Sequence, residues 1–312
     1  MKQCLYCYQS LATTETGFHP ACSKKIFGQK TPPELPYKEE DMESLASQIV
    51  REQITVTGVQ PKLSLGIAKA KNGPSRFTIV GLWGGYILKP PTLQYPQLAE
   101  VEDLTMHLAS LAKIQVVPHS LIRMRSGTLA YLTKRIDRTK KEKIHMEDMC
   151  QLTERLTEHK YQGSYELIAK AIHQHSSSPG LDIVNFYEIV LFSFLTGNAD
   201  MHLKNFSLIN KPNLGYILSP AYDLVATALV NPADDEDLAL TLNGKKKKLN
   251  KSDFVHALSS AGLDAKQQEN IFKKLKKALP NWIEFINHSF ISADLKKDYI
   301  GLIQERLERL TL

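Results

Sequence analysis

The sequence predicts an α+β protein whose first half is rich in β-strands and whose second half is mainly helical. Before Lys140, short runs of β-branched and aromatic residues alternate with turn residues. One helical pattern, Leu98 to Lys113, interrupts these runs. After Lys140, apolar residues recur mostly at helical spacing, and one strand–turn–strand pattern lies among the helices.

Turn signals separate the strands of the first half, at Asn72-Gly73-Pro74 and at Gly84-Gly85. An apolar stripe runs along the interrupting helix, and acidic residues near its start suit the helix dipole. The stripe contains Val101, Leu104, Leu108 and Leu111, and the acidic residues are Glu100, Glu102 and Asp103. The predicted strands are residues 63–65, Phe77 to Val80, Tyr86 to Lys89, Val116 to Met124 and Leu129 to Ile136.

The second half contains a series of amphipathic or apolar helical patterns. Ser164 and Ser252 are expected to cap helix starts, and Gly262 is expected to end a helix. Phe206 to Ser219 is predicted to be a small hairpin around Gly215. The predicted helices are Met146 to Thr157, Ser164 to His175, Asp182 to Thr196, Ser252 to Ala261, Ala265 to Leu279 and Ala293 to Leu310.

Composition places the chain among globular proteins. Its 312 residues are 43% hydrophobic and 23% charged, which suits two domains or one two-lobed domain. The net charge of +6 suits an anionic ligand, but it comes from two lysine runs that read as solvated surface, so no nucleic-acid binding is expected. Four cysteines, no apolar signal core and no long apolar run predict a soluble, cytoplasmic protein that binds no membrane.

The most informative segment is Gly197 to Phe206, a loop dense in polar residues between an apolar helix and the predicted hairpin. Asp200 precedes Asn205 by five residues, and Asp223 follows the hairpin. Phosphoryl transfer by a protein kinase needs an Asp at the substrate hydroxyl, an Asn five residues later for Mg²⁺, and a second metal-binding Asp. The alternative is a capped loop, because Asp and Asn are common turn formers.

Other residues suit contacts with phosphate. Lys204 could neutralise a phosphate, whereas His202 suits a structural role equally well. Lys89 ends an apolar strand, and we expect it to pair with Glu102 on the next helix, with Glu100 as the competing partner. The segment Thr55 to Lys62 has a single glycine, so an ordinary hairpin competes with a phosphate-facing loop.

Taken together, these segments resemble the HipA-type serine/threonine kinase toxins, and most closely the short HipT-like members of HipBST toxin–antitoxin systems. The resemblance implies a two-lobed protein-kinase-like fold: an N-terminal extension (1–35), an N-lobe (36–138) and a helical C-lobe with the catalytic loop (139–312). It rests on residues 57–64, 86–90, 134–138, 147–152, 197–207 and 219–223.

The resemblance also implies a role for each matching residue. Asp200 would be the catalytic base, Asn205 and Asp223 would hold Mg²⁺, and Lys89, with Glu102 as its partner, would contact ATP. Lys134, Arg135 and Ile136 would form the hinge beside adenine. The phosphate-facing loop would be Thr57, Gly58, Val59, Gln60, Pro61 and Lys62, and the pocket would also be lined by His202, Lys204 and Tyr222.

Members of this family transfer the γ-phosphate of ATP to a serine of an aminoacyl-tRNA synthetase and so arrest growth. The expected partners are therefore that protein substrate, a DNA-binding antitoxin, and a small antitoxin resembling the N-terminal subdomain that this chain is too short to include. Relatives autophosphorylate on serines, whereas this chain offers Thr55 and Thr57. The two threonines are either phosphorylation sites or simply one face of a strand.

The N-terminus contains a candidate zinc knuckle. Cys4 and Cys7 are separated by two residues, as are His19 and Cys22. Structural zinc takes four such nitrogen and sulfur ligands, but a short extension with reduced thiols explains the same pattern. Two other functions compete with the protein kinase: a small-molecule kinase, and a non-enzymatic, zinc-bearing regulator that binds nucleic acid or a partner protein.

Overall fold

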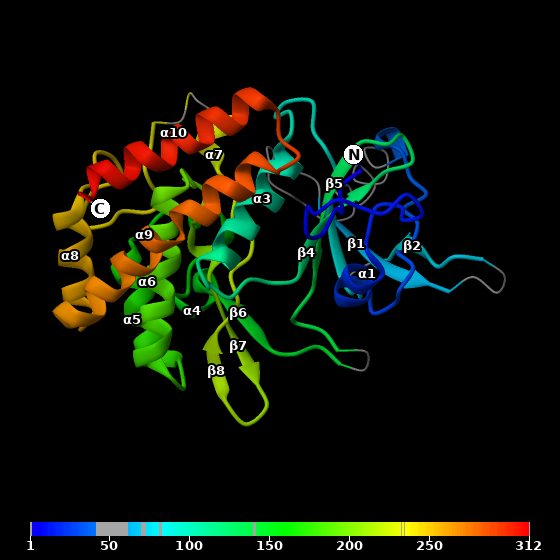
Figure 1. Cartoon of the computed structure of the whole chain (residues 1–312). Helices are drawn as coiled ribbons and strands as arrows, with labels where there is room; N and C mark the ends of the chain where they lie inside the picture. Colours follow the sequence, from blue (N-terminus) through cyan, green and yellow to red (C-terminus); the bar gives the residue numbers. More distant parts are fainter. Residues whose placement is uncertain are drawn as a thin grey trace. The chain divides into compact units, whose positions relative to one another are not determined.

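The computed structural model describes residues 2–41, 62–69, 73–80, 83–139, 142–231, 233 and 235–311 (Figure 1). The chain forms two compact units. The first comprises Met1–Asp103, Val117–Arg138 and His288–Phe290, and the second comprises Leu104–Val116, Thr139–Asn287 and Ile291–Leu312. The helix α3 (Leu98–Leu111) therefore begins in the first unit and ends in the second.

The first unit is built on an antiparallel five-stranded sheet of order β2-β1-β3-β5-β4. In some of its strands apolar and polar residues alternate, and in others most residues are apolar. Leu65, Phe77 and Leu88 are fully buried. The central strand β3 ends at Lys89, so that lysine lies at the carboxyl end of the middle strand of the sheet. The elements are α1 (Pro20–Phe27), β1 (Leu63–Ala68), β2 (Arg76–Ile79), β3 (Tyr86–Lys89), β4 (His119–Arg123) and β5 (Leu129–Lys134).

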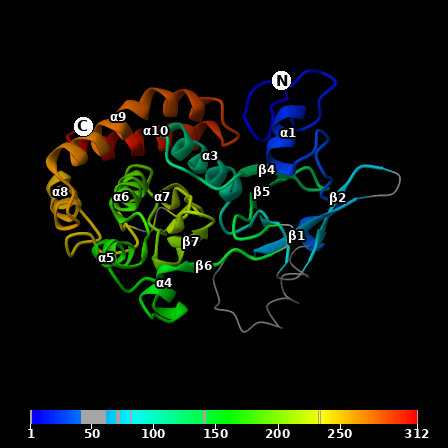
Figure 2. The same ribbon diagram turned by 90° about the horizontal axis from the view of Figure 1, so that it is seen from below.

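The second unit is mainly helical, as predicted, and contains a three-stranded sheet of order β6-β7-β8. In both Figure 1 and Figure 2, α9 and α10 lie side by side, and α4 lies beside β6. The predicted hairpin is confirmed as β7 and β8. The elements are β6 (Met146–Asp148), α4 (Met149–Leu152), α5 (Tyr165–His175), α6 (Pro179–Leu195), β7 (Ser207–Lys211), β8 (Gly215–Leu218), α7 (Thr227–Val230), α8 (Lys251–Ser260), α9 (Ala265–Asn287) and α10 (Ala293–Arg309).

The predicted helix from Met146 to Thr157 is wrong at both ends. Its first three residues form β6, which pairs with β7. Asp148 then caps α4: its carboxylate accepts a hydrogen bond from Gln151 N, and the Gln151 side chain accepts one from Asp148 N. This capping box starts a helix that ends after a single turn at Leu152.

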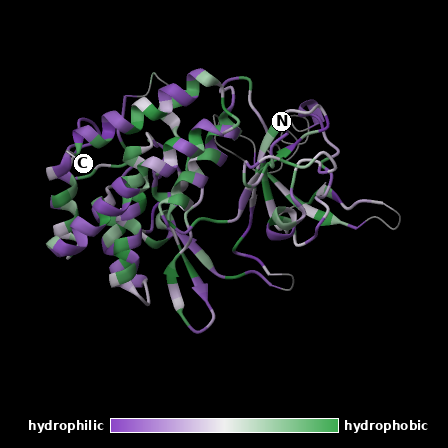
Figure 3. Ribbon diagram, in the orientation of Figure 1, coloured by the Kyte–Doolittle hydropathy of each residue, from purple (hydrophilic) through white to green (hydrophobic). Residues whose placement is uncertain are grey.

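Other boundaries also differ. The helix predicted to end at Leu279 continues through Pro280 to Asn287, because its buried face continues to Trp282 and Ile286. Both hydrophobic and hydrophilic residues occur along this helix, as expected for an amphipathic element (Figure 3). Ser164 is confirmed as an N-cap, whereas the cap of α8 is Asn250 rather than Ser252.

In the described part of the chain, no helix combines the length and the apolar character needed to cross a membrane.

Candidate active site

The polar loop after α6 begins at a position where only glycine fits. α6 is buried almost all round and ends at the cap Thr196. Gly197 has a φ of 67°, and a Cβ atom there would lie 2.6 Å from Leu302 Cδ2 and 2.9 Å from Ala228 Cβ. The chain therefore turns sharply out of the core and presents the residues that follow.

The structure brings Asp200 and Asn205 together. Asn205 Nδ2 donates a 2.8 Å hydrogen bond to Asp200 O, and Asp200 N donates to Asn198 Oδ1 at 3.1 Å. His202 N also donates to Asp200 O, at 2.8 Å. Because the amide nitrogen of Asn205 is used in this way, its amide oxygen is the atom that is left to accept a ligand.

The Asp200 carboxylate has a partner that the sequence did not suggest. Tyr161 Oη donates a 2.5 Å hydrogen bond to Asp200 Oδ1. The Tyr161 ring also packs edge-on against His202, with centroids 4.8 Å apart. Tyr161 lies between α4 and α5, far from Asp200 in the sequence. No spacing or motif in the sequence therefore indicates this contact.

His202 is a neutral side chain at physiological pH. Burial lowers the pKa of its imidazole to about 4, although the charges of Asp200 and Asp223 oppose this shift. Within the described residues its Nδ1 is buried without a hydrogen-bond partner. A neutral, 95% buried ring favours the structural role over a cationic one.

Lys204 and Tyr222 connect the loop to residues of the three-stranded sheet. Lys204 Nζ lies 2.6 Å from Asp148 Oδ2, at the junction of β6 and α4. Tyr222 Oη contacts Ser207 Oγ at 2.5 Å and donates to Lys204 O at 3.0 Å. Burial raises the pKa of Tyr222, so its hydroxyl stays protonated and available for both bonds.

Asp223 follows the hairpin in a conformation that few non-glycine residues adopt. Its φ is 57°, in the left-handed region, which costs about 1 kcal/mol or more. The preceding chain is held by Ala221 N, which donates to Gln115 O at 2.8 Å. The carboxylate of Asp223 and the amide oxygen of Asn205 are the oxygen ligands that Mg²⁺ prefers, so the donor chemistry of this unit fits that ion.

In the first unit, the expected pair of Lys89 and Glu102 is present. Lys89 Nζ lies 2.6 Å from Glu102 Oε1, and the two residues are 5% and 1% exposed. The Lys89 ammonium also lies 5.5 Å from the centroid of the Tyr131 ring. Glu100, the competing partner, is only partly buried, and burial raises the pKa of its carboxyl.

The predicted hinge begins at Lys134, the last residue of β5, and continues into Arg135 and Ile136. The backbone N–H groups of Lys134 and Arg135 donate to Pro118 O and Gly85 O. Contacts with a nucleotide base would therefore fall to Ile136 or to carbonyl oxygens. Lys62 is exposed just before β1. The other residues of the predicted phosphate loop lie outside the described residues, as does the candidate phosphorylation site Thr55; these loop residues are Thr57, Gly58, Val59, Gln60 and Pro61.

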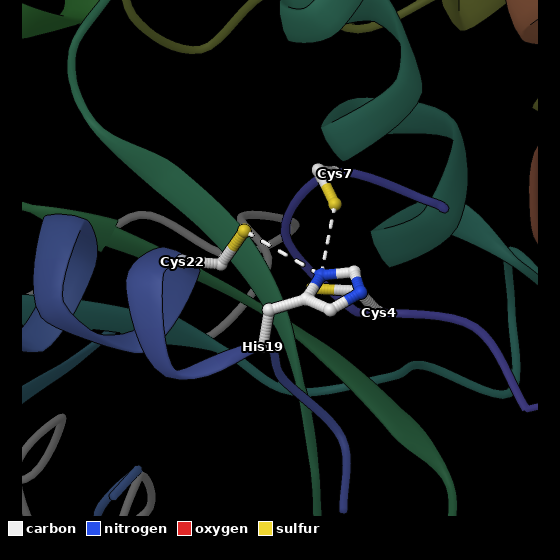
Figure 4. Close-up of side chains that lie close together, drawn as sticks. All are labelled: Cys4, Cys7, His19 and Cys22. Carbon is white, nitrogen blue, oxygen red and sulfur yellow. Dashed lines mark hydrogen bonds between the residues drawn. The ribbon is translucent and has the colours of Figure 1, made fainter. Parts of the chain in front are cut away.

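The candidate zinc ligands converge at the N-terminus (Figure 4). The donor atoms of Cys4, Cys7, His19 and Cys22 all lie within 4.8 Å of one another. Burial opposes the thiolate of Cys4, but hydrogen bonds from the backbone N–H groups of Cys7, His19 and Tyr6 outweigh it and lower its pKa. Burial, with the charge of Cys4, raises the pKa of Cys22 to about 12.

Comparison with known families gives one match over most of the chain. The family described as "HipA-like C-terminal domain" matches residues 54–283. This range contains every predicted kinase residue from Thr55 to Asp223 and excludes the four candidate zinc ligands.

Two similar sequences carry names that mark them as candidate kinases. One, Y4dM of Sinorhizobium fredii, is 32% identical over 227 residues, which are 69% of this chain and 55% of the relative. The other, from Haemophilus influenzae, is 30% identical over 224 residues, which are 68% of this chain and 62% of the relative. The chain thus spans little more than half the length of these relatives.

Two solved structures share the fold. A structure of HipA from Shewanella oneidensis MR-1, in complex with HipB and operator DNA, matches with a TM-score of 0.69 and 20% identity, covering 89% of this chain and 72% of that one. The proinflammatory kinase CtkA of Helicobacter pylori matches with a TM-score of 0.54 and 17% identity, covering 72% and 87%. The α+β class and the kinase-like fold are therefore confirmed.

Proposed function

Because the chain belongs to the HipA-like C-terminal domain family, we propose that it is an ATP- and Mg²⁺-dependent protein serine/threonine kinase. The observation that carries the proposal is the loop after α6, where Asn205 is hydrogen-bonded to Asp200 at the spacing that kinase chemistry uses. Asp223, after the hairpin, supplies the further carboxylate. All three residues belong to the second unit.

Each residue has a definite task in this proposal. Asp200 accepts a hydrogen bond from Tyr161 through Oδ1, which leaves Oδ2 to orient the substrate hydroxyl and take its proton. Asn205 and Asp223 would hold the metal through oxygen atoms. Lys89, fixed by Glu102, would contribute positive charge to the phosphates. When bound, Mg²⁺ supplies neutralisation of the phosphate charge.

The family relationship supports the partners and the substrate class that we propose. The related HipA is found with HipB and operator DNA, so we propose a DNA-binding antitoxin as a partner of this chain. A second, small antitoxin would resemble the N-terminal subdomain of larger family members. The substrate would be a serine of an aminoacyl-tRNA synthetase, and Thr55 and Thr57 would be the autophosphorylation sites.

The two rival functions have less support. Four lysines of the two lysine runs are paired with acidic residues, which lowers the positive charge that these runs offer to a phosphate backbone. A small-molecule kinase can have the same spacing of Asp200 and Asn205. The two kinds of kinase are distinguished by their phosphorylated product, which is a small molecule in one case and a protein in the other. The four lysine pairs are Lys245 with Asp253, Lys246 with Glu236, Lys247 with Asp235, and Lys274 with Glu188.

Transfer of labelled γ-phosphate from ATP into a cell lysate tests the proposal. We expect the wild type to label a protein and Asp200→Asn to lose the activity by at least about a thousandfold. Asp298→Asn, an exposed aspartate on α10, serves as the matched control and keeps the activity. Label confined to a small molecule would identify the rival kinase function, and full activity of Asp200→Asn would overturn the assignment.

A further inference from the structure

Four metal-binding side chains lie outside the kinase residues and outside the matched family domain. Cys4 and Cys7 come from a turn near the N-terminus, closed by a hydrogen bond from Tyr8 N to Cys4 O. His19 is the N-cap of α1, and Cys22 lies in its first turn. Two separate segments of the first unit thus supply two ligands each.

The distances suit a tetrahedral zinc ion. Zn–S bonds of about 2.3 Å and Zn–N bonds of about 2.0 Å place nitrogen and sulfur ligands roughly 3.5 Å apart, and two sulfurs roughly 3.8 Å apart. His19 Nδ1 lies 3.4 Å from Cys7 Sγ and 3.8 Å from Cys22 Sγ. All four donor atoms lie within 4.8 Å of one another. Figure 4 shows the three cysteine side chains gathered around the His19 ring.

The surrounding hydrogen bonds set His19 in the form that binds a metal. His19 Nε2 lies 3.1 Å from Ser10 O. A carbonyl oxygen only accepts hydrogen bonds, so Nε2 must carry the proton. In the neutral ring this leaves Nδ1 with its lone pair facing the sulfurs, and such an outer contact to a carbonyl is the usual support of a zinc-binding histidine.

We propose that Cys4, Cys7, His19 and Cys22 bind one zinc ion, which joins the N-terminal turn and α1 to each other on the sheet of the first unit. Four protein ligands leave no open position, so the centre is structural rather than catalytic. The site needs only residues of the first unit.

Each of the joined segments contacts a different part of the sheet. In the turn, Leu5 O accepts hydrogen bonds from Leu121 N at 3.2 Å and from Ser120 Oγ at 3.0 Å, both on β4. In α1, Ile26 O accepts from Tyr86 Oη on β3 at 3.0 Å. A zinc ion would therefore connect contacts on β4 with contacts on β3, two strands that are not neighbours in the sheet.

The centre also holds Tyr8, the residue after Cys7. Tyr8 has a φ of 63°, which is unfavourable for a bulky side chain and is maintained by the turn around it. Its buried hydroxyl donates to Asp103 Oδ2 at 2.8 Å, and Asp103 Oδ1 lies 2.7 Å from His119 Nδ1. Asp103 follows Glu102, so the zinc centre supports the segment of α3 that carries the partner of Lys89.

Metal analysis of the full chain, purified without added zinc, tests the binding. We expect about 1 equivalent of zinc per chain and at least a fivefold loss in Cys22→Ser. Cys150→Ser, at a buried free cysteine outside the cluster, keeps the full amount and controls for loss of a thiol. Less than about 0.1 equivalent in the wild type, or a disulfide among the three cysteines in mass spectrometry of the alkylated chain, would overturn the proposal.

Two further measurements remain informative if Cys22→Ser does not fold. Replacement of the metal by Co²⁺ in the wild type should give the thiolate charge-transfer and visible bands of a tetrahedral site, and octahedral bands would contradict the ligand set. Removal of the metal by a chelator should lower the melting temperature by roughly 5 °C or more, whereas an unchanged temperature would contradict the structural role. Neither readout depends on kinase activity, so the zinc proposal and the proposed function fail separately.

Discussion

Lys89 Nζ lies 2.6 Å from Glu102 Oε1, and both side chains are almost completely buried. Two opposite charges removed from water in this way depend on each other. Removal of one leaves an unpaired buried charge, whereas replacement of both by apolar side chains is often neutral.

For this pair we predict that a double substitution restores the stability of the protein but not its kinase activity. Glu102→Ala should lower the free energy of unfolding by about 3–5 kcal/mol. The double variant Lys89→Met/Glu102→Leu should recover most of this loss but transfer no phosphate, because the charge for the nucleotide is gone. Urea unfolding and labelled-ATP assays on the same preparations check both parts. Glu100→Gln is the matched control, and equal losses in it would show that Glu102 has no special role.

Tyr161 should act as a positioning residue through its 2.5 Å hydrogen bond to Asp200. Tyr161→Phe keeps the ring that packs against His202 and removes only the hydroxyl. A bond of this kind at a 43% exposed side chain is worth about 1 kcal/mol, so kcat should fall roughly fivefold. In steady-state kinetics, KM for ATP should be unchanged. In urea unfolding, the free energy of unfolding should stay within about 0.5 kcal/mol of the wild type. A change confined to KM would contradict this role.

His202 should make the protein sensitive to acid. Burial lowers its pKa to about 4, below the ordinary 6.5. As the pH falls through 6.5, the unfolded chain takes up a proton that the folded chain does not, so the free energy of unfolding decreases until about pH 4. The full effect is about 3 kcal/mol. Urea unfolding of wild type and His202→Gln at pH 7 and pH 4.5 measures it: the wild type should lose more stability than the variant, and equal losses would refute the assignment.

Elements whose apolar residues follow a clear local pattern were predictable from the sequence. The strand Tyr86 to Lys89 and the helix from Leu98 follow their apolar spacing, and the Lys89–Glu102 pair follows from them. β6 was missed because a three-residue strand is defined by its pairing with β7, far along the chain. The end of α9 was misplaced because Pro280 normally argues for a helix end, whereas buried packing of Trp282 extends the helix beyond it.

The site shows the same division between local and distant information. The contact of Asp200 with Asn205, and the convergence of the four N-terminal ligands, could be predicted because each depends on spacing within short segments. The partners of Asp200 and Lys204 could not. Tyr161 and Asp148 reach the loop through tertiary packing, such as the bond from Leu203 N to Lys160 O, which leaves no periodic signal in the sequence.

A buried ion cluster joins the C-terminal helix to the core of the second unit. Asp237 is 4% exposed, and its carboxylate contacts Arg306 and, at 2.6 Å, Arg309 Nη2, both on α10. It also accepts a hydrogen bond from Leu249 N at 2.9 Å. Burial alone would raise the pKa of Asp237, but hydrogen bonds from Arg309 and Leu249 and the charges of both arginines outweigh it and lower the pKa.

Asp237→Asn should therefore destabilise the second unit strongly. It leaves two arginines without their buried counter-charge, for which a loss of about 3–5 kcal/mol is expected. The same arginines lie 4.8 and 5.2 Å from the ring of Phe194 on α6, the helix that leads into the Asp200 loop. We thus expect phosphate transfer to fail at a lower urea concentration than in the wild type, in parallel with unfolding.

The stabilisation that Asp237 provides should depend on pH in a definite direction. Since the folded pKa of Asp237 is depressed, its contribution to stability is fully present above the ordinary carboxyl pKa of 3.8 and is lost as the pH falls below it. The difference in unfolding free energy between wild type and Asp237→Asn should accordingly be constant from pH 6 to 8 and shrink below about pH 4. Asp298→Asn, at an exposed residue of α10, should stay within about 0.5 kcal/mol of the wild type throughout. If Asp237→Asn matched that control at pH 7, the cluster would contribute nothing, and the packing of α10 alone would have to hold it in place.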